Sequence, residues 1–170
     1  MRKKQNMIFK DIKKLAQKTP QSADIATPDF TAAPNVIILP ADIKKLNEIL
    51  SYLKNDMQQK HLTPKAQFNM ITASEEIFSN IALYAYNTNE KAIVTIKTEL
   101  IDNLYSITFC DAGKKFNPLK NTMPDISQDI KDRDIGGLGV FLAKKLTDNQ
   151  EYTYHNKQNI LKISIDINKN

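Results

Sequence analysis

The chain has 170 residues, of which 41% are hydrophobic and 25% charged, a balance typical of one soluble globular domain. It has no apolar run of membrane-spanning length and no signal-like start, and its single cysteine, Cys110, agrees with a reducing compartment, so we expect a cytoplasmic protein without a membrane partner. The formal net charge of +5 arises from the first twenty residues, which carry seven Lys/Arg and one acid, and the presence of only two arginines argues against direct nucleic-acid recognition.

Residues 1–34 are predicted to form an N-terminal extension and linker. Residues 7–17 are expected to form a short helix whose apolar side carries Ile8, Ile12, Leu15 and Ala16. Three prolines among small polar residues then indicate a linker. The basic charge favours a solvated tail over a binding site for an acidic partner. The role of the extension stays open: it is a tail, a segment that closes over the site, or a contact for a partner.

The body of the chain, residues 35–168, is predicted to begin with a short strand at 35–39 and two helices. The first helix is expected over 40–60, entered at Pro40, with Ile43, Leu46, Leu50, Leu53 and Met57 at helical spacing. The second follows an N-cap at Thr63 with Pro64 in its first turn, and its apolar stripe is expected to hold Ile71, Phe78, Ala82 and Ala85.

Strands dominate the second half of the body. Residues 91–100 and 104–110 alternate with a period of two around Asp102-Asn103, which predicts a β-hairpin. A polar loop is expected over 118–135, a third helix over 138–148, and a final strand pair around Asn156-Lys157. The order predicts an α/β fold, a two-layer sandwich in which three helices cover one face of a mixed, mostly antiparallel sheet.

Two polar residues of the second helix, Glu76 and Asn80, are four residues apart and therefore lie on one face, one turn apart. The amide oxygen of Asn80 is a hard ligand suited to Mg²⁺, and the carboxylate of Glu76 can accept a proton. A solvated helix face is the alternative reading of this pair.

The four glycines stand in two short stretches. Asp111 and Gly113 follow an apolar strand, where a carboxylate can accept a hydrogen bond from the exocyclic amine of adenine and a glycine lets a flat base come close. The others open the third helix, where Gly137 and Gly139 leave backbone amides free to bind phosphate. Each glycine stretch alone is more typical of a plain turn. Together with the Glu76–Asn80 pair and in this order, however, the three motifs supply a base, a metal ligand, an adenine acceptor and a phosphate cradle.

This arrangement resembles the GHKL (Bergerat) ATP-binding fold, and within it the anti-sigma-factor serine/threonine protein kinases, over about residues 35–167. "EEIFSNIALYAY" (75–86) resembles the N-box of that family, which implies that Glu76 is the catalytic base and that Asn80 holds Mg²⁺. "DAGKKFNP" (111–118) resembles the adenine box, which implies adenine contacts for Asp111 and Gly113. "GGLGVFLAKKLTD" (136–148) resembles the second glycine box, with Gly137 and Gly139 at the phosphates, and residues 118–135 would be the ATP lid.

Three positions depart from the family pattern. Tyr84 stands where many relatives carry a histidine, and Arg133 is the only lid arginine but is offset from the position that meets phosphate in some relatives. A hydroxyl on the last strand often completes the adenine site, and here Ser164 or Asn159 would take its place.

The resemblance implies a kinase that uses ATP and Mg²⁺ to phosphorylate an anti-anti-sigma (STAS-type) protein. The resemblance also implies that the kinase regulates a sigma factor by partner switching. It further implies a possible homodimer. Two alternatives remain open: a nucleotide-gated binding module without phosphotransfer, and a histidine-kinase-like ATPase domain, although neither His61 nor His155 lies in a phosphoacceptor context.

Overall fold

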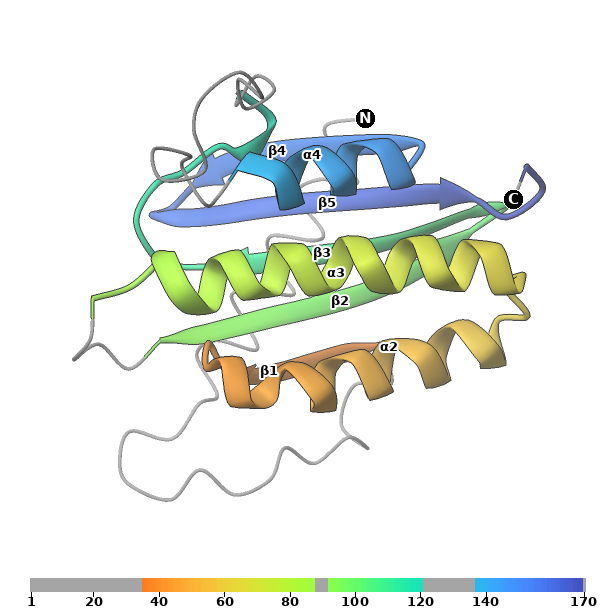
Figure 1. The fold of residues 1–170 in the computed structure, drawn as a ribbon, viewed down its shortest axis with the longest axis horizontal. Helices are drawn as coiled ribbons and strands as arrows, with labels where there is room; N and C mark the ends of the chain where they lie inside the picture. The colour runs from red at the N-terminus through yellow and green to blue at the C-terminus, as the bar shows by residue number, and fades with distance from the viewer. Residues whose placement is uncertain (1–34, 88–91, 121–136, 170) are drawn as a thin grey trace.

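The computed structural model describes residues 35–87, 92–120 and 137–169. The predicted extension at 1–34, Arg133 and most of the predicted lid lie outside these residues. The elements follow one another as β1 (Val36–Pro40), the 3-10 turn η1 (Ile43–Lys45), α2 (Leu46–Gln59), α3 (Pro64–Tyr84), β2 (Ile93–Ile101), β3 (Leu104–Asp111), the 3-10 turn η2 (Pro118–Lys120), α4 (Gly137–Leu146), β4 (Asn149–His155) and β5 (Gln158–Asp166) (Figure 1).

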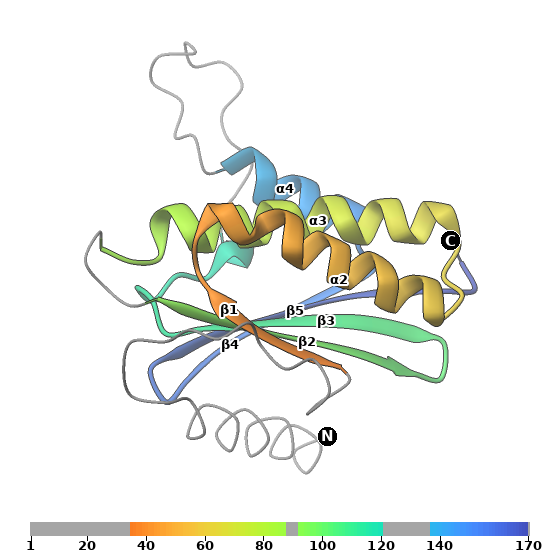
Figure 2. The ribbon, with the colours of Figure 1, turned by 90° about the horizontal axis from the view of Figure 1, so that it is seen from below.

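The five strands form one sheet in the order β1-β2-β3-β5-β4, and every neighbouring pair is antiparallel. Helices α2, α3 and α4 lie together on one face of this sheet (Figure 2). The predicted two-layer α/β sandwich is therefore confirmed, although the sheet is antiparallel throughout its described strands and not mixed. None of the described helices is long and apolar enough to cross a membrane.

The start of the first helix differs from the expectation. Pro40 ends β1, where it pairs with Ile93, and does not open the helix. An edge strand tolerates proline because one side of its backbone needs no ladder hydrogen bond. The chain instead turns at Asp42, whose side chain accepts a hydrogen bond from Lys44 N (2.9 Å), and Ile43 is 40% exposed although its spacing predicted a core position.

Helix α3 begins as predicted, because the Thr63 hydroxyl accepts a hydrogen bond from Ala66 N (3.1 Å) and Pro64 is the first helical residue. Its buried side is broader than the predicted stripe. Figure 1 shows α3 between α2 and α4, so it buries residues toward both helices as well as toward the sheet. The fully buried apolar positions include Met70, Ala73 and Phe78, whereas Ile71, Ala82 and Ala85 are only partly buried.

The two predicted hairpins are confirmed, and both turn without glycine. Asp102 adopts φ 54° between β2 and β3, while Asn156 and Lys157 adopt φ 51° and 61° between β4 and β5. Two successive positive φ values are the geometry of a type I′ turn, whose twist matches that of the flanking strands. Residues with side chains therefore adopt the left-handed backbone conformation at these turns, where glycine would be less strained.

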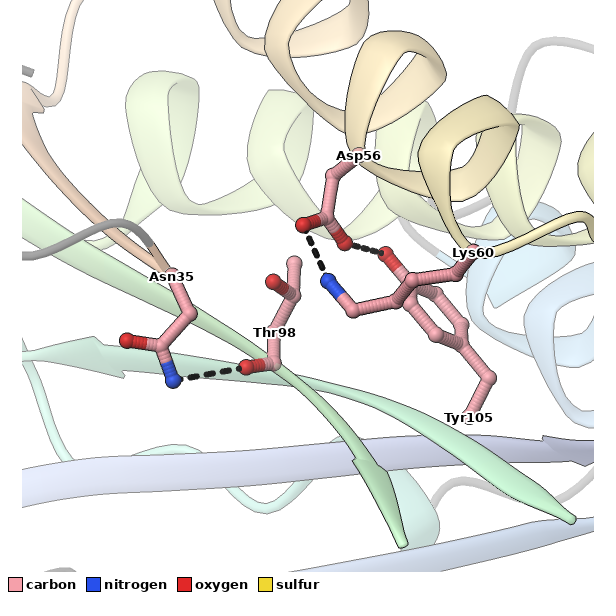
Figure 3. Close-up of polar contacts among 5 residues, drawn as sticks. All are labelled: Asn35, Asp56, Lys60, Thr98 and Tyr105. Atoms are coloured by element: carbon pink, nitrogen blue, oxygen red, sulfur yellow. Dashed lines mark hydrogen bonds and ion pairs between the residues drawn. The ribbon is translucent and has the colours of Figure 1, made fainter.

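A buried polar cluster joins the C-terminal half of α2 to the start of β3 (Figure 3). The Tyr105 hydroxyl donates to Asp56 Oδ2 (2.7 Å), and the ammonium of Lys60 pairs with the other carboxylate oxygen. Burial, followed by the charge of Asp56, raises the pKa of Tyr105, so the phenol stays a donor. Nearby, Asn35 Nδ2 donates to Thr98 O (3.2 Å), which fixes the entry into β1.

Candidate functional site

Glu76 and the first turn of α4 are in direct contact. A Cβ built on Gly139 would lie 1.9 Å from Glu76 Oε2 and 2.8 Å from its Cδ. A side chain at position 139 would therefore compete with the Glu76 carboxylate for the same space. The structure therefore brings together the predicted base and the predicted phosphate-binding glycines, which are sixty-odd residues apart in the sequence.

Asn80 lies one helical turn beyond Glu76 on α3, and both residues are half-buried. Figure 1 places this end of α3, the end of β3 and the start of α4, where Gly137 is the first residue, at the same end of the domain. The predicted site residues thus come from three elements that converge. Tyr84 lies in the last turn of α3, where it is exposed.

Gly113 packs against the end of α3. A Cβ at this position would lie 2.5 Å from Ala85 O and 2.7 Å from Ala85 Cβ. The same carbonyl accepts a hydrogen bond from Lys114 N (2.7 Å). The space that the missing side chain leaves is therefore occupied by the protein itself, and the structural role of Gly113 is to seat the loop after β3 on α3. The predicted contact of Gly113 with the adenine ring stays a prediction.

Asp111 is the buried acid of the site, with 5% of its surface exposed. Its Oδ1 accepts hydrogen bonds from Gly113 N (2.9 Å) and Asn159 Nδ2 (3.0 Å). Within the described part of the chain, Oδ2 accepts none. Burial raises the pKa of Asp111, and these two hydrogen bonds act against that rise. A ligand that donates a hydrogen bond to Oδ2 would relieve an unfavourable environment for the carboxylate.

Asn159 is the residue of the last strand that joins this site. Its Nδ2 also reaches Lys114 O (3.1 Å), and its Oδ1 accepts from Phe116 N (3.1 Å) and the Tyr152 hydroxyl (2.8 Å). The other candidate, Ser164, shares a hydrogen bond with Ser106 (3.0 Å). That pair lies on the opposite face of the sheet, because alternate residues of a strand face opposite ways.

Tyr86 holds the same loop from a second side and was not anticipated as a site residue. Its hydroxyl accepts a hydrogen bond from Ala112 N (2.9 Å) and donates to Ile93 O (3.2 Å). The "AY" pair at 85–86, which follows the acid–amide pair, is the sequence signal for this contact. Ala85 and Tyr86 together position the loop that carries Asp111.

The start of the predicted lid is anchored to α4. Lys144 Nζ donates to Leu119 O (2.7 Å) in η2, and Leu119 and Pro118 share a small apolar crevice with Val140 and Ile77. The residues that would form the rest of the lid lie outside those described.

The residues present fit a nucleotide with a hard divalent cation. The described residues contain no group of three or more His, Cys, Asp or Glu side chains that could hold a metal ion. The amide oxygen of Asn80 is a ligand type that Mg²⁺ accepts, and this ion commonly takes its further ligands from phosphate oxygens and water. Among the described residues, the Oδ2 of Asp111 has no hydrogen-bond donor and is suited to a purine amine, whereas the space beside Gly139 is taken by the Glu76 carboxylate. The predicted phosphate contacts of Gly137 and Gly139 stay a prediction.

Three features define an ATPase domain of the histidine-kinase type. Helices cover one face of the sheet, and a buried acid lies at the end of the central strand β3. In addition, α4 begins at glycines and packs against α3, the helix that carries Glu76 and Asn80. The chain belongs to the histidine kinase-like ATPase domain family, whose model matches residues 39–165. Among curated proteins, none matches the sequence.

Two solved structures share the fold. The RsbU and RsbW domains of Rv1364c from Mycobacterium tuberculosis align over 78% of this chain and 32% of that one, with 12% identity and a TM-score of 0.54. The histidine kinase domain of the blue-light activated histidine kinase EL346 from Erythrobacter litoralis aligns over 87% of this chain and 67% of that one, with 14% identity and a TM-score of 0.50. The chain therefore spans about a third of the first structure and two thirds of the second, and both show the same fold.

Proposed function

We propose that this domain is a serine/threonine protein kinase that uses ATP and Mg²⁺ to phosphorylate an anti-anti-sigma (STAS-type) protein. The observation that carries the proposal is the contact of Glu76 with the first turn of α4, at the same end of the domain as the Asp111–Asn159 pair. In the proposal, these groups serve as a base, a phosphate cradle and a purine acceptor. The fold shared with the RsbU and RsbW domains of Rv1364c supports this class of kinase.

In the proposed reaction, Glu76 accepts the proton of the substrate hydroxyl. The hydroxyl oxygen forms a bond to the γ-phosphorus, the bond from that phosphorus to the bridging oxygen breaks, and ADP leaves. Asn80 would hold Mg²⁺, which neutralises charge on the phosphates, and the amides opening α4 would bind phosphate oxygens. Asp111 Oδ2 would accept the adenine amine, with Asn159 fixing the orientation of the carboxylate.

The proposed partners follow from the family resemblance. Phosphorylation of the STAS-type protein would release it and leave the kinase free to bind a sigma factor. Homodimers are proposed on the same ground. A cytoplasmic location is proposed because both partners belong to transcription control.

The test compares Glu76→Gln with Glu75→Gln, which makes the same change at the neighbouring, exposed acid. Loss of a general base lowers rates by about a hundredfold to ten-thousandfold. We therefore expect Glu76→Gln to lose phosphotransfer to a STAS-type protein by at least a hundredfold while ATP binding, measured by calorimetry, stays within about threefold. Glu75→Gln should transfer at the wild-type rate.

Three results would overturn the assignment in different ways. Transfer that survives Glu76→Gln would remove the role of this base. ATP-dependent partner binding without a phosphorylated product would favour the nucleotide-gated binding module. A product whose phosphate is lost in acid, as expected of phosphohistidine, would favour a histidine-kinase-like activity.

A further inference from the structure

Strand β4 is an outer edge of the sheet (Figure 1). Among the described strands it pairs only with β5, and the register runs without a break from Asn149 opposite Ser164 to His155 opposite Gln158. Five of its seven residues are exposed. In the described part of the chain, one side of a regular and well-exposed strand is therefore left without a strand partner.

The opposite edge of the sheet is protected in a way that β4 is not. Natural sheets discourage pairing between their edges with proline, lysine, bulges or very short edge strands. Strand β1 has five residues and ends at Pro40, which has no backbone N–H to donate. The seven residues of β4 include neither proline nor lysine, and Tyr152, Thr153 and Tyr154 at its centre all favour strands. β4 therefore has the features of an edge that accepts a further strand.

The backbone groups on the open side of β4 belong to two tyrosines. In an antiparallel pair, residues whose N–H and C=O point to the partner strand alternate with residues whose groups point away from it. The turn between β4 and β5 has two residues, so the pair beside it, His155 and Gln158, is hydrogen-bonded. Thr153 then also bonds to β5, whereas Tyr152 and Tyr154 direct their N–H and C=O to the open edge.

The central sequence of β4, "EYTYH" (151–155), is complementary to itself. When two copies run antiparallel about a two-fold axis at Thr153, this threonine faces its own counterpart and Tyr152 faces Tyr154 of the second copy. Two positions from the axis, Glu151 faces His155 of the second copy, whose ring can donate a hydrogen bond. Thr–Thr and aromatic pairs stabilise neighbouring strands. Every residue of this segment thus meets a favourable counterpart in a second copy of the same chain.

The backbone pattern agrees with this register. The two Tyr152–Tyr154 pairs are hydrogen-bonded pairs, each of which exchanges two bonds, so about four backbone hydrogen bonds form. Thr153 and its counterpart form a non-hydrogen-bonded pair, in which the side chains come closer together. An axis at Tyr152 instead would keep one aromatic pair in place of two and would put Glu151 opposite Thr153. The axis at Thr153 is therefore the better register.

We propose that two copies of the chain pair through their β4 edges, antiparallel about a two-fold axis at Thr153, and so join their sheets into one continuous sheet. The inference rests on the proposed function only in giving a surface to the homodimer named there. The interface adjoins the candidate site, because the Tyr152 hydroxyl donates to Asn159 Oδ1 (2.8 Å) and Asn159 Nδ2 donates to Asp111.

A charge placed at position 153 would face the same charge on the second copy. The experiment measures the mass of the full-length chain by sedimentation, without nucleotide, from about 10 µM to about 1 mM. It compares wild type with Thr153→Lys, with Thr153→Glu and with an equal mixture of these two variants. Ser51→Lys, which adds a lysine at an exposed position of α2, is the control for added charge.

We expect wild type and Ser51→Lys to dimerise alike, and each Thr153 variant to dimerise about tenfold more weakly, because like charges directly opposite each other destabilise a strand pair. The mixture should recover the dimer, since lysine then faces glutamate. The proposal would be overturned by a wild type that stays monomeric at the highest concentration, by variants that dimerise like wild type, or by a mixture that recovers nothing.

A disulfide test covers the case in which the charged variants do not fold. Across the proposed axis, two Cα atoms of residue 153 lie about 4.5 Å apart, within disulfide reach. Two Cα atoms of residue 149, on the same face of the same strand, would lie about 27 Å apart. We expect air oxidation to cross-link Thr153→Cys but neither Asn149→Cys nor wild type, which controls for Cys110. Equal cross-linking of the two variants, or none at 153, would overturn the proposal.

The outcomes for this interface and for the kinase activity can be told apart. Neither test contains ATP or a protein substrate, so a dimer that transfers no phosphate would leave the interface standing. A monomer that phosphorylates a STAS-type protein would overturn the interface alone.

Discussion

A Cβ on residue 139 would lie 1.9 Å from Glu76 Oε2, so the carboxylate of α3 and the backbone of α4 occupy adjoining space that only glycine leaves open. The atom that would clash is Glu76 Oε2, which lies at the far end of a flexible side chain. Glu76 Cβ, which is bonded to the backbone, is 3.3 Å from the added Cβ. A side chain at 139 would therefore move the carboxylate more than it would disturb the fold.

The first prediction concerns Gly139→Ala. Alanine favours a helix over glycine by about 1 kcal/mol, which offsets the crowding, so the free energy of unfolding should stay within about 1 kcal/mol of wild type. Phosphotransfer should fall by about tenfold to a hundredfold, because the base is displaced. In the Glu76→Gln background the same change should have little further effect, and additive losses would contradict the proposed contact.

The second prediction concerns Asp111→Asn. The new side chain keeps Oδ1 as acceptor for Gly113 N and Asn159 Nδ2 but replaces the free Oδ2 with a donor. ATP affinity, measured by calorimetry, should fall at least tenfold, or about 1.4 kcal/mol, while the fold remains intact. Unchanged affinity would show that Asp111 does not contact the nucleotide.

The third prediction follows from the sign of the pKa shift of Asp111. Its pKa is raised above the ordinary 3.8 in the folded protein, so between these two values the folded state holds more protons than the unfolded state. This residue should therefore lower the free energy of unfolding as pH rises from about 3.8 through its raised value. Denaturation of ligand-free wild type and Asp111→Asn across that range should show the variant gaining relative stability with pH, and parallel curves would contradict the shift.

The fourth prediction contrasts Gly113 with Gly139. A Cβ at 113 would meet the Ala85 carbonyl oxygen at 2.5 Å, and this backbone atom cannot step aside as a carboxylate can. Gly113→Ala should therefore lower the free energy of unfolding by about 2–3 kcal/mol. Adding Ala85→Gly should rescue only part of this loss in denaturant titrations, since it removes the contact with Cβ but not the one with the carbonyl. Wild-type stability of Gly113→Ala would disprove the close packing.

The fifth prediction concerns the cluster at the other end of the domain. Asp56→Ala leaves the Lys60 ammonium and the Tyr105 hydroxyl without their partner, and removing one member of a buried pair costs about 3–5 kcal/mol. Tyr105→Phe removes a single hydrogen bond and should cost about 1–2 kcal/mol. Neither should alter ATP affinity by more than about twofold in the folded protein. A larger change in affinity would place this cluster in the nucleotide site.

The local elements of the domain were predictable because their signals are local. Thr63 caps α3 and Pro64 opens it, since these residues suit a helix start whatever packs nearby. The turn at Asn156-Lys157 joins two alternating strands, and the strand order then favours an antiparallel sheet with one covered face. The spacing of Glu76 and Asn80 likewise predicts their common side of α3.

What the spacing could not predict is which neighbour each side chain meets. Ile43 lies on the predicted stripe of α2 but is exposed, while Ile49 is fully buried, because η1 replaces the expected first helical turn. The buried charge of Asp56 has no local signal either, since its partner Tyr105 is 49 residues away.

The sequence by itself determined the elements, their order and the three motifs of the candidate site, because caps, turns and periodicity act over a few residues. Only the tertiary structure decided that Asn159 and not Ser164 joins Asp111, since strand register sets which face each residue takes. It also decided that Ala85, and not open space, fills the gap beside Gly113. Such choices depend on contacts between residues far apart in the chain, which arise only when the sheet and helices pack.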